Sequence, residues 1–486
     1  MPAPVSLMNN FELGKKKFES GLSLLLEKKY IAAEVEFIES LKLVPDRIST
    51  IKNLILIYIK TENREKISKL LNNNKHLEKN TELIFAKAYE DFFNKRYEDS
   101  IALCNIIIQK LDKELQFETL GLLASCHKEK GFFLQALKIY KKSLNKFKKN
   151  YITYTKIGNL FFELGKITKA KIYFQKCKKL NPSDKVNLWN LSLCLLKHKK
   201  ILEGFRLYEN RWSLISSEPK KYQSIPKLKK LKDIQDKTIL IWSEQGLGDN
   251  LLFSRFIINL LDLAKEVTFQ IDDNFEIFKF LYPEANIIHS ENIKNKKFDY
   301  QIPICSLPYI LGLSELENLN FKRLNIKKEI REKNNFNVEN DKLNIGLSLF
   351  GGSYRKYRSI PIKHFGELLL NKNIQFYNLS KKFKSDTSEY NSSKIIDLGD
   401  KNFIQLKEIL KHLDIIFSVD TSLIHLLGTL NFKSYLLLNY NSDWRWFNDH
   451  EKTIWYPSVT IIKQNNFNNW DNVVEEVKKI INDKIK

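Results

Sequence analysis

The chain has 486 residues, of which 43% are hydrophobic, and it carries a formal net charge of +23 at pH 7. It is too long for a single hydrophobic core, so two or three domains are expected. No run of about 18 apolar residues occurs, which argues against a membrane span. Residues 1–10 also lack the charged and apolar regions of a signal peptide. We therefore expect a soluble, cytoplasmic protein.

The positive charge is spread along the whole chain. Lysine occurs throughout, beside abundant asparagine and isoleucine, which is typical of a compositional bias and not of a basic groove for a nucleic acid. We predict no nucleic-acid partner, although a positive surface still helps to attract a smaller anionic substrate.

Five cysteines occur without the spacing of a metal site or a redox pair. None belongs to a CxxC motif, and most lie in apolar helical positions: Cys104, Cys126, Cys177, Cys194 and Cys305. This pattern predicts small core residues in a reducing compartment.

The first two hundred residues contain an internal repeat. A small residue is followed four positions later by a residue of buried type, as in Ala136 with Tyr140 and Ala170 with Phe174, and the two pairs are 34 residues apart. This period resembles the tetratricopeptide repeat, a pair of antiparallel helices that buries its apolar faces against its neighbours. We expect an N-terminal tail at residues 1–13 and about six repeats over residues 14–212, with a degenerate second repeat near residues 51–71.

Two roles for this array remain open from the sequence. Its concave surface would hold a peptide or another protein, or the array would only brace the following domain. Residues 213–236, rich in proline and lysine without a sustained apolar face, are expected to form an extended linker.

From residue 237 onwards, short apolar runs alternate with helical patterns, which predicts parallel sheets of the doubly wound α/β type. A charged, asparagine-rich stretch near residues 327–341 divides this half into two lobes, residues 237–335 and 336–486. The expected strands lie at residues 238–242, 267–271, 287–288, 300–302, 345–349, 375–379, 395–398, 415–419 and 434–438. Ligands of such folds bind at the carboxyl ends of the strands.

Three groups of residues follow expected strand ends. The first is a glycine loop with Gly246 and Gly248, after which Asp249 is either the cap of a helix that runs from Asn250 or a catalytic base. The second is a glycine loop followed by cations: Gly351, Gly352, Arg355, Lys356 and Arg358.

The third group is the turn Asp420-Thr421-Ser422, which opens a helix with His425 about one turn further on. The free N–H groups and hydroxyls of such a turn suit a phosphate. Taken singly, each group has an ordinary structural explanation as a turn, a basic loop or a helix cap. Taken together at strand ends of two lobes, the three groups favour a ligand site.

Ordered motifs in this half resemble a known enzyme family. They are Trp242-Ser-Glu-Gln-Gly-Leu-Gly-Asp, Arg358-Ser-Ile-Pro, Ser418-Val-Asp-Thr-Ser-Leu-Ile-His, Asp443-Trp-Arg-Trp and Trp455-Tyr-Pro-Ser. In this order they resemble the bacterial tetratricopeptide proteins with a glycosyltransferase-like domain, which is similar to the heptosyltransferases of glycosyltransferase family 9. The resemblance implies a GT-B fold that transfers a sugar with inversion from a nucleoside diphosphate sugar. It implies no metal and no other cofactor.

The resemblance also implies roles for individual residues. Asp249 would be the catalytic base. The donor diphosphate would be bound by Arg358, Asp420, Thr421, Ser422 and His425. Further contacts to donor or acceptor would come from Gly246, Gly248, Gly351, Gly352, Arg355 and Lys356. The acceptor would be a glycan or a protein, held by the repeats.

One segment departs from the family pattern. The family has a tryptophan and an Asn-Pro after the first strand of the second lobe, where this chain reads Leu347-Ser-Leu-Phe-Gly-Gly-Ser, so the sugar and the base of the donor stay open. Residues 443–446 and 455–457 either stack on a nucleobase or pack in the core. Two other functions also remain: an inactive repeat scaffold, and a protein-modifying O-linked N-acetylglucosamine transferase, which joins the same two parts.

Overall fold

The computed structural model describes residues 5–148, 150–214, 221–294, 296–314, 341–351, 356–381, 395–447 and 451–485. Of the candidate site residues, Gly352 and Arg355 lie outside these ranges, and only the backbone of Lys356 is described. The chain divides into two compact units, Met1–Leu160 and Phe161–Lys486, and each is described by itself.

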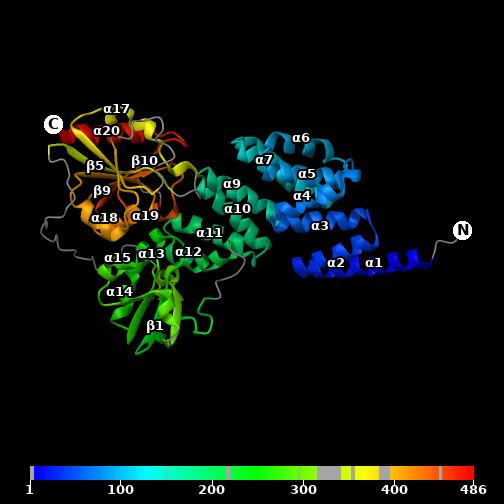
Figure 1. Cartoon of the computed structure of the whole chain (residues 1–486), viewed down its shortest axis with the longest axis horizontal. Helices are drawn as coiled ribbons and strands as arrows, with labels where there is room; N and C mark the ends of the chain where they lie inside the picture. Colours follow the sequence, from blue (N-terminus) through cyan, green and yellow to red (C-terminus); the bar gives the residue numbers. More distant parts are fainter. Residues whose placement is uncertain are drawn as a thin grey trace. The chain divides into compact units, whose positions relative to one another are not determined.

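The N-terminal part is helical (Figure 1). Within described residues 5–148 and 150–208, twelve helices follow one another in pairs: α1 (Val5–Leu26) and α2 (Tyr30–Leu43), α3 (Ile48–Lys60) and α4 (Arg64–Asn73), α5 (Thr81–Phe93) and α6 (Tyr97–Ile107), α7 (Lys113–Glu129) and α8 (Phe133–Lys146), α9 (Tyr151–Glu163) and α10 (Ile167–Leu180), α11 (Lys185–Lys197) and α12 (Ile201–Tyr208).

The period of the sequence is visible in the backbone. The turn inside each helix pair contains one residue in the left-handed region, and successive turns are 33 to 36 residues apart: Lys28, Glu62, Lys95, Gly131, Gly165 and Lys199. The small residues of the pattern are fully buried, as Ala136 and Ala170 show, because they lie where helices cross closely. The degenerate second repeat still forms a helix pair, with Ile51 and Ile67 in its core.

The second unit contains two parallel sheets. The first has the strand order β3-β2-β1-β4, from the strands β1 (Thr238–Trp242), β2 (Glu266–Gln270), β3 (Asn286–Ile288) and β4 (Tyr300–Pro303). The second has the order β10-β9-β8-β5-β6-β7, from the strands β5 (Leu343–Ser348), β6 (Ile374–Asn378), β7 (Ile395–Asp397), β8 (Ile415–Val419), β9 (Ser434–Leu438) and β10 (Val459–Lys463).

In chain order, the second sheet runs 3-2-1-4-5-6, the arrangement of doubly wound nucleotide-binding folds, and the first sheet has its 3-2-1-4 part. The order reverses between β1 and β4 in one sheet and between β5 and β8 in the other, which is where such folds bind ligands. The nine expected strands are present within one or two residues at either end. The sequence interpretation missed β10, which pairs with β9 in parallel.

The expected linker is more ordered than an extended connector. In its described part, residues 221–236, Leu228 and Ile234 are buried, and Leu228 N–H donates to the carbonyl of Gln301 in β4. This segment therefore extends the edge of the first sheet, and its 3-10 turn η3 (Leu231–Ile234) contributes to the core.

One hydrophobic core joins the last helices of the array to both sheets. The ring of Phe205 in α12 lies 6.1 Å from that of Phe253, which follows β1, and 5.7 Å from that of Trp444, which follows β9. The last helix pair of the array is thus part of the same folded body as the α/β region. All five cysteines are buried and none forms a disulfide, as predicted for core residues.

Candidate functional site

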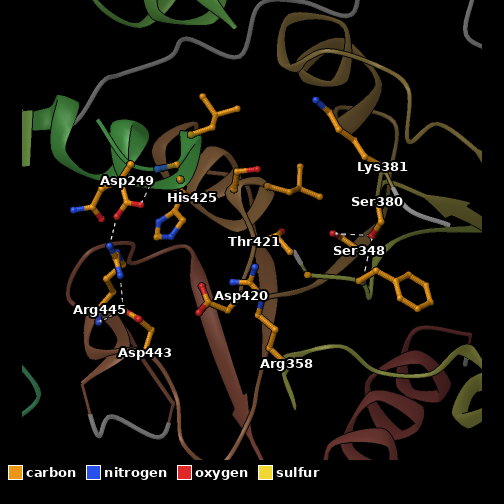
Figure 2. Close-up of a pocket in the computed structure, with 18 of the residues that line it drawn as sticks. Asp249, Ser348, Arg358, Ser380, Lys381, Asp420, Thr421, His425, Asp443 and Arg445 are labelled. Carbon is orange, nitrogen blue, oxygen red and sulfur yellow. Dashed lines mark hydrogen bonds and ion pairs between the residues drawn. The ribbon is translucent and has the colours of Figure 1, made fainter. Parts of the chain in front are cut away.

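A cavity of about 870 Å³ lies at the carboxyl ends of the strands in the second unit (Figure 2). It brings together residues of all three groups expected from the sequence: Gly246, Gly248, Asp249, Gly351, Arg358, Asp420, Thr421, Ser422 and His425. They come from the loops and helix starts that follow β1, β5 and β8, so the strand ends of both sheets open into one space.

Asp249 lies in the first turn of α13 (Leu247–Ser254). The helix begins at Leu247, three residues before the expected Asn250, and it ends at Ser254, where the 3-10 turn η4 (Arg255–Ile257) leads into α14 (Ile258–Leu261). Oδ2 of Asp249 accepts a hydrogen bond from Gly246 N–H at 3.3 Å. Oδ1 accepts one from Nη2 of Arg445. Asp249 therefore stabilises the helix start and lines the cavity at the same time.

Arg445 bridges two aspartates. Its Nη1 donates to Oδ1 of Asp443 at 2.6 Å, Nη2 donates to Asp249, and its guanidinium lies 4.7 Å from the ring centre of Trp444. Burial opposes the charge of Arg445, but the two carboxylates outweigh it and raise its pKa. This bridge fixes the direction of the Asp249 carboxylate.

The aromatic residues around Arg445 are core residues. Trp444 is 2% exposed and Trp446 is fully buried within η11 (Trp444–Trp446), and Trp446 stacks on the ring of His425 at 5.2 Å. Of the two interpretations left open by the sequence, packing is therefore the one found for this segment, and Trp455 and Tyr456 are buried as well.

His425 lies in α19 (Ser422–Thr429) and is 4% exposed. Its Nδ1 is 2.9 Å from the hydroxyl of Tyr456. Burial, together with the nearby guanidinium groups of Arg445 and Arg255, lowers the pKa of His425 to about 3. The imidazole is therefore neutral at physiological pH, and it can meet a phosphate as a hydrogen-bond donor but not as a cation.

The turn between β8 and α19 has the form expected from the sequence. Thr421 is the N-cap residue of α19, and its hydroxyl lies 3.2 Å from that of Ser418. Asp420 is 8% exposed and lines the cavity beside Thr421 and Ser422. The first N–H groups of such a helix have no partner within the helix, and its dipole favours an anion there.

Gly351 and Arg358 occupy the loop after β5. A Cβ atom on Gly351 would clash with Nε of Arg358, so the arginine crosses directly over the glycine backbone. The N–H of Gly351 donates to Ser359 Oγ at 3.0 Å. The glycine at this position thus makes room for a protein cation at the cavity wall.

The sequence interpretation missed several lining residues on the second sheet. Ser348 is the last residue of β5 and Ser380 follows β6, and their hydroxyls are 3.1 Å apart. Lys381 and Lys401 also line the cavity. The carboxyl-end rule, applied to β6 as it was applied to β5 and β8, would have found Ser380 and Lys381.

A second missed wall comes from the end of the repeat array: Trp189, Leu193, Tyr208, Arg211 and Trp212. The hydroxyl of Tyr208 donates to Oε1 of Gln245 at 3.2 Å, and Gln245 has a positive φ of 57° in the loop after β1. A side chain in the left-handed region needs support from its surroundings. The last repeat supplies that support four residues before Asp249.

Arg211 links the end of the array to the first sheet. It follows α12 in η2 (Glu209–Leu214), is 5% exposed, and forms a two-pronged pair with Glu244 at 2.7 Å for both hydrogen bonds. Glu209 and Ser306 complete its hydrogen bonds, and Glu244 also accepts from the N–H of Cys305 at 3.0 Å. Burial opposes the charge of Arg211, but the two glutamates overcome this effect and raise its pKa.

The described part of the chain contains neither a metal-binding cluster nor a membrane-spanning helix. No group of three or more histidine, cysteine, aspartate or glutamate side chains there could hold a metal ion. No helix there is both long and apolar enough to cross a membrane.

Comparisons with known proteins concern the repeats. Residues 151–184, which include α9 and α10, match the family model of the tetratricopeptide repeat. No curated protein matches the chain. Solved structures that share similarity include the APC/C hetero-tetramer Cut9-Hcn1, with 14% identity, a TM-score of 0.35, and coverage of 42% of this chain and 40% of that chain.

Two pilus-related structures are also similar. One is PilF of Pseudomonas aeruginosa, with 14% identity, a TM-score of 0.32, and coverage of 43% of this chain and 95% of that chain. The other is the type IV pilus biogenesis factor PilW, with 13% identity, a TM-score of 0.35, and coverage of 42% and 95%. The family match identifies a tetratricopeptide repeat at residues 151–184, within the array of helix pairs.

Proposed function

We propose that the second half of the chain is an inverting, metal-independent glycosyltransferase of the GT-B fold. It moves a sugar from a nucleoside diphosphate sugar to a hydroxyl of a glycan or protein acceptor. The observation that carries the proposal is a single cavity with the carboxylate Asp249 from the first sheet, and Arg358 with the start of α19 from the second. A volume of about 870 Å³ is in the range of small-molecule sites.

The topology supports the same proposal. The second sheet has the strand order of a nucleotide-binding fold, and the first sheet has the 3-2-1-4 part of it. The cavity lies where the strand order reverses in each sheet, beside Gly246 in the first and beside Thr421 in the second. Two such lobes that share a cleft are the arrangement that the GT-B fold requires, with the donor on one lobe and the acceptor on the other.

The proposed reaction is one displacement. The acceptor oxygen attacks the anomeric carbon, the bond from that carbon to the phosphate oxygen breaks, and its electron pair leaves with the diphosphate. Asp249 takes the proton of the acceptor hydroxyl. Arg358 and the N-terminus of α19 stabilise the negative charge on the leaving diphosphate.

The geometry around Asp249 suits a base with a fixed direction. The Gly246 N–H holds one oxygen and Arg445 holds the other, so the carboxylate does not have to be reoriented when the acceptor arrives. Its side chain remains 17% exposed, which leaves oxygen lone pairs available to a hydroxyl in the cavity.

The test combines donor binding with transfer. Calorimetry against a panel of uridine, guanosine, adenosine and cytidine diphosphate sugars identifies the donor. Asp249→Asn is then expected to lower turnover by about 100- to 10,000-fold, the contribution of a general base, and to leave donor Kd unchanged. The control Glu276→Gln, an exposed carboxylate in α15 (Phe275–Leu281), keeps full turnover. Normal turnover in Asp249→Asn would refute the assignment of Asp249 as the base. If no nucleotide sugar binds, the proposal that the protein is a glycosyltransferase fails.

The second candidate is a protein-interaction scaffold whose α/β half does not turn over. The match of residues 151–184 to the tetratricopeptide repeat favours it, since stacked repeats build extended binding surfaces. The nucleotide titration separates the two candidates, because a scaffold needs no donor. Finding the transferred sugar on peptides and not on glycans would favour the protein-modifying transferase.

A further inference from the structure

The two ring nitrogens of His425 have different surroundings. Nδ1 lies 2.9 Å from the hydroxyl of Tyr456. Nε2 makes no hydrogen bond within the described part of the chain, yet it is not fully buried. His425 lines the cavity, and Figure 2 shows its ring between Asp249 and the turn at Thr421. Nε2 is therefore the atom through which the imidazole meets a ligand.

The position of one proton decides what Nε2 offers to that ligand. Burial lowers the pKa of His425 and keeps the ring neutral, and a neutral imidazole has its proton either on Nδ1 or on Nε2. With the proton on Nε2, the cavity contains an N–H donor. With the proton on Nδ1, the cavity contains a lone pair, which repels the oxygens of an anion. The tautomer thus decides whether His425 attracts or repels a diphosphate.

The hydroxyl of Tyr456 selects between the two tautomers, because it has a single proton to donate. Nδ1 of His425 is one acceptor within reach. The other is the hydroxyl oxygen of Thr429, whose own proton goes to the carbonyl of His425 at 2.7 Å. An imidazole nitrogen is more basic than a hydroxyl oxygen, so the phenol donates to Nδ1. Nδ1 then carries no proton, and the proton of the ring is on Nε2.

Arg255 makes Tyr456 a better donor. Its guanidinium lies 4.6 Å from the ring centre of Tyr456 and is held there by a hydrogen bond from Nη1 to the carbonyl of Trp455 at 2.8 Å. Burial raises the pKa of the Tyr456 hydroxyl, and the charge of Arg255 opposes this effect. Arg255 follows α13. The lobe that carries Asp249 therefore influences a side chain of the other lobe.

The two rings are held in place by close packing. A Cβ atom on Gly428 would clash with the ring of Tyr456, so this ring lies directly on the backbone of α19. Trp446 stacks on the imidazole at 5.2 Å. The hydrogen bond between Tyr456 and His425 thus needs no reorientation when a ligand arrives.

We propose that Tyr456 is a positioning residue that keeps the proton of His425 on Nε2, where it donates to an oxygen of the leaving diphosphate. This inference rests on the proposed function and adds a residue to its donor site. Tyr456 acts through His425 and does not itself touch the ligand. The imidazole adds a directed N–H to the charge of Arg358, without the cost of burying another cation.

The first readout uses the full chain and needs no ligand. In protein labelled with nitrogen-15 histidine, long-range proton–nitrogen NMR correlations distinguish protonated from unprotonated ring nitrogens, and the signals lost in His425→Gln identify this residue. Wild type should show the proton on Nε2 alone. Tyr456→Phe keeps the ring but lacks the hydroxyl, so the Nδ1 tautomer should appear. The control Tyr377→Phe removes a buried hydroxyl that bonds to Asn344 outside the cavity, and it should match wild type.

The second readout is the Kd of uridine, guanosine, adenosine and cytidine diphosphates, measured by calorimetry. For the nucleotide that binds, Tyr456→Phe is expected to raise the Kd about tenfold, the effect of one hydrogen bond. The Kd of the matching nucleoside, which lacks the diphosphate, should not change. In a His425→Gln background, adding Tyr456→Phe should have no further effect, because Tyr456 acts only through His425. Tyr377→Phe should keep the wild-type Kd.

The two readouts separate this inference from the proposed function. A proton on Nδ1 in wild type would overturn the inference and leave the proposed function standing. The same holds if Tyr456→Phe weakens nucleotide binding equally with and without His425. If wild type has the Nε2 proton but binds none of the four nucleoside diphosphates, the proposed function fails, and with it the diphosphate as the partner of that proton.

Discussion

A Cβ atom on Gly248 would lie 2.9 Å from Cδ2 of His425 and 3.4 Å from Cα of Ser422. Helix α13, which carries Asp249, thus packs against the first turn of α19 with no space for a side chain. From the sequence, this glycine was expected to admit a ligand. In the structure, the missing side chain of Gly248 also allows α19 to approach α13 closely. This close contact sets the separation between the proposed base and the turn at Thr421.

Enlarging Gly248 should therefore force the two helices apart. We expect Gly248→Val to lower the stability of the second unit by about 1–3 kcal/mol, as overpacking does. All seven tryptophans lie in this unit, so urea unfolding followed by their fluorescence reports on it alone. The control is Gly246→Ala, whose Cβ would meet only Oδ2 of Asp249 at an ordinary 3.6 Å. Equal losses in the two variants would contradict the close packing.

Removing Arg445 should leave two carboxylates without their cation. Because Asp249 and Asp443 are only 17% and 6% exposed, Arg445→Met is expected to cost about 3 kcal/mol. Arg445→Lys should recover part of this loss, since a lysine keeps the charge but does not present two directed donors. A double-mutant cycle with Asp249→Asn measures the pair directly, and a coupling energy near zero would show that Arg445 does not hold Asp249.

The Arg211–Glu244 pair allows a comparison between a buried and an exposed ion pair. Arg211→Met should lower the stability of the second unit by about 3–5 kcal/mol, because Glu244 is left buried without its counterion. Adding Glu244→Gln should recover part of the loss. Lys478→Met, which breaks an exposed pair with Glu367, should leave the unfolding midpoint unchanged. The result to compare is the urea midpoint, and similar midpoints for Arg211→Met and wild type would refute the role of the pair.

His425 predicts a pH dependence of stability. Its pKa is about 3 in the folded chain and near 6.5 when unfolded, so below pH 6.5 the unfolded chain binds a proton that the folded chain does not. The contribution of the neutral His425 to the free energy of unfolding is therefore fully present above pH 6.5. It is lost as the pH decreases toward 3, by up to about 1.4 kcal/mol per pH unit. His425→Gln should show a flatter pH profile between pH 6.5 and 5. His364→Gln, a partly exposed histidine outside the cavity, should keep the wild-type slope.

The repeats and strands were predictable because both depend on local patterns. The period of 34 residues places Ala136 and Ala170 at helix crossings, and most strands are short apolar runs that are buried on both faces. Strand β10 was missed because its exposed Thr460 interrupts the apolar run and because the preceding Trp455-Tyr-Pro was interpreted as an aromatic motif. A short strand at a sheet edge gives a weak signal in sequence.

The candidate site was only partly predictable, for a physical reason. Glycines and turn residues after β1, β5 and β8 have a signature that the carboxyl-end rule can place. Tyr208 and Arg211 have none, because their position depends on how α12 and η2 pack on the loop after β1. Arg445 was visible in its motif, but its bridge to Asp249 joins residues 196 positions apart and follows from tertiary contacts alone.

The ion pair between Arg211 and Glu244 also decides where this protein can be divided. A fragment that starts at Lys237 would contain both sheets, yet it would lose Arg211 and Tyr208 and leave a buried glutamate without its counterion. A fragment that starts at Phe161 would retain them. Repeats that precede α11 and α12 could thus be exchanged without breaking the second unit. Helices α11 and α12 themselves must stay with the α/β sheets, because they share their core.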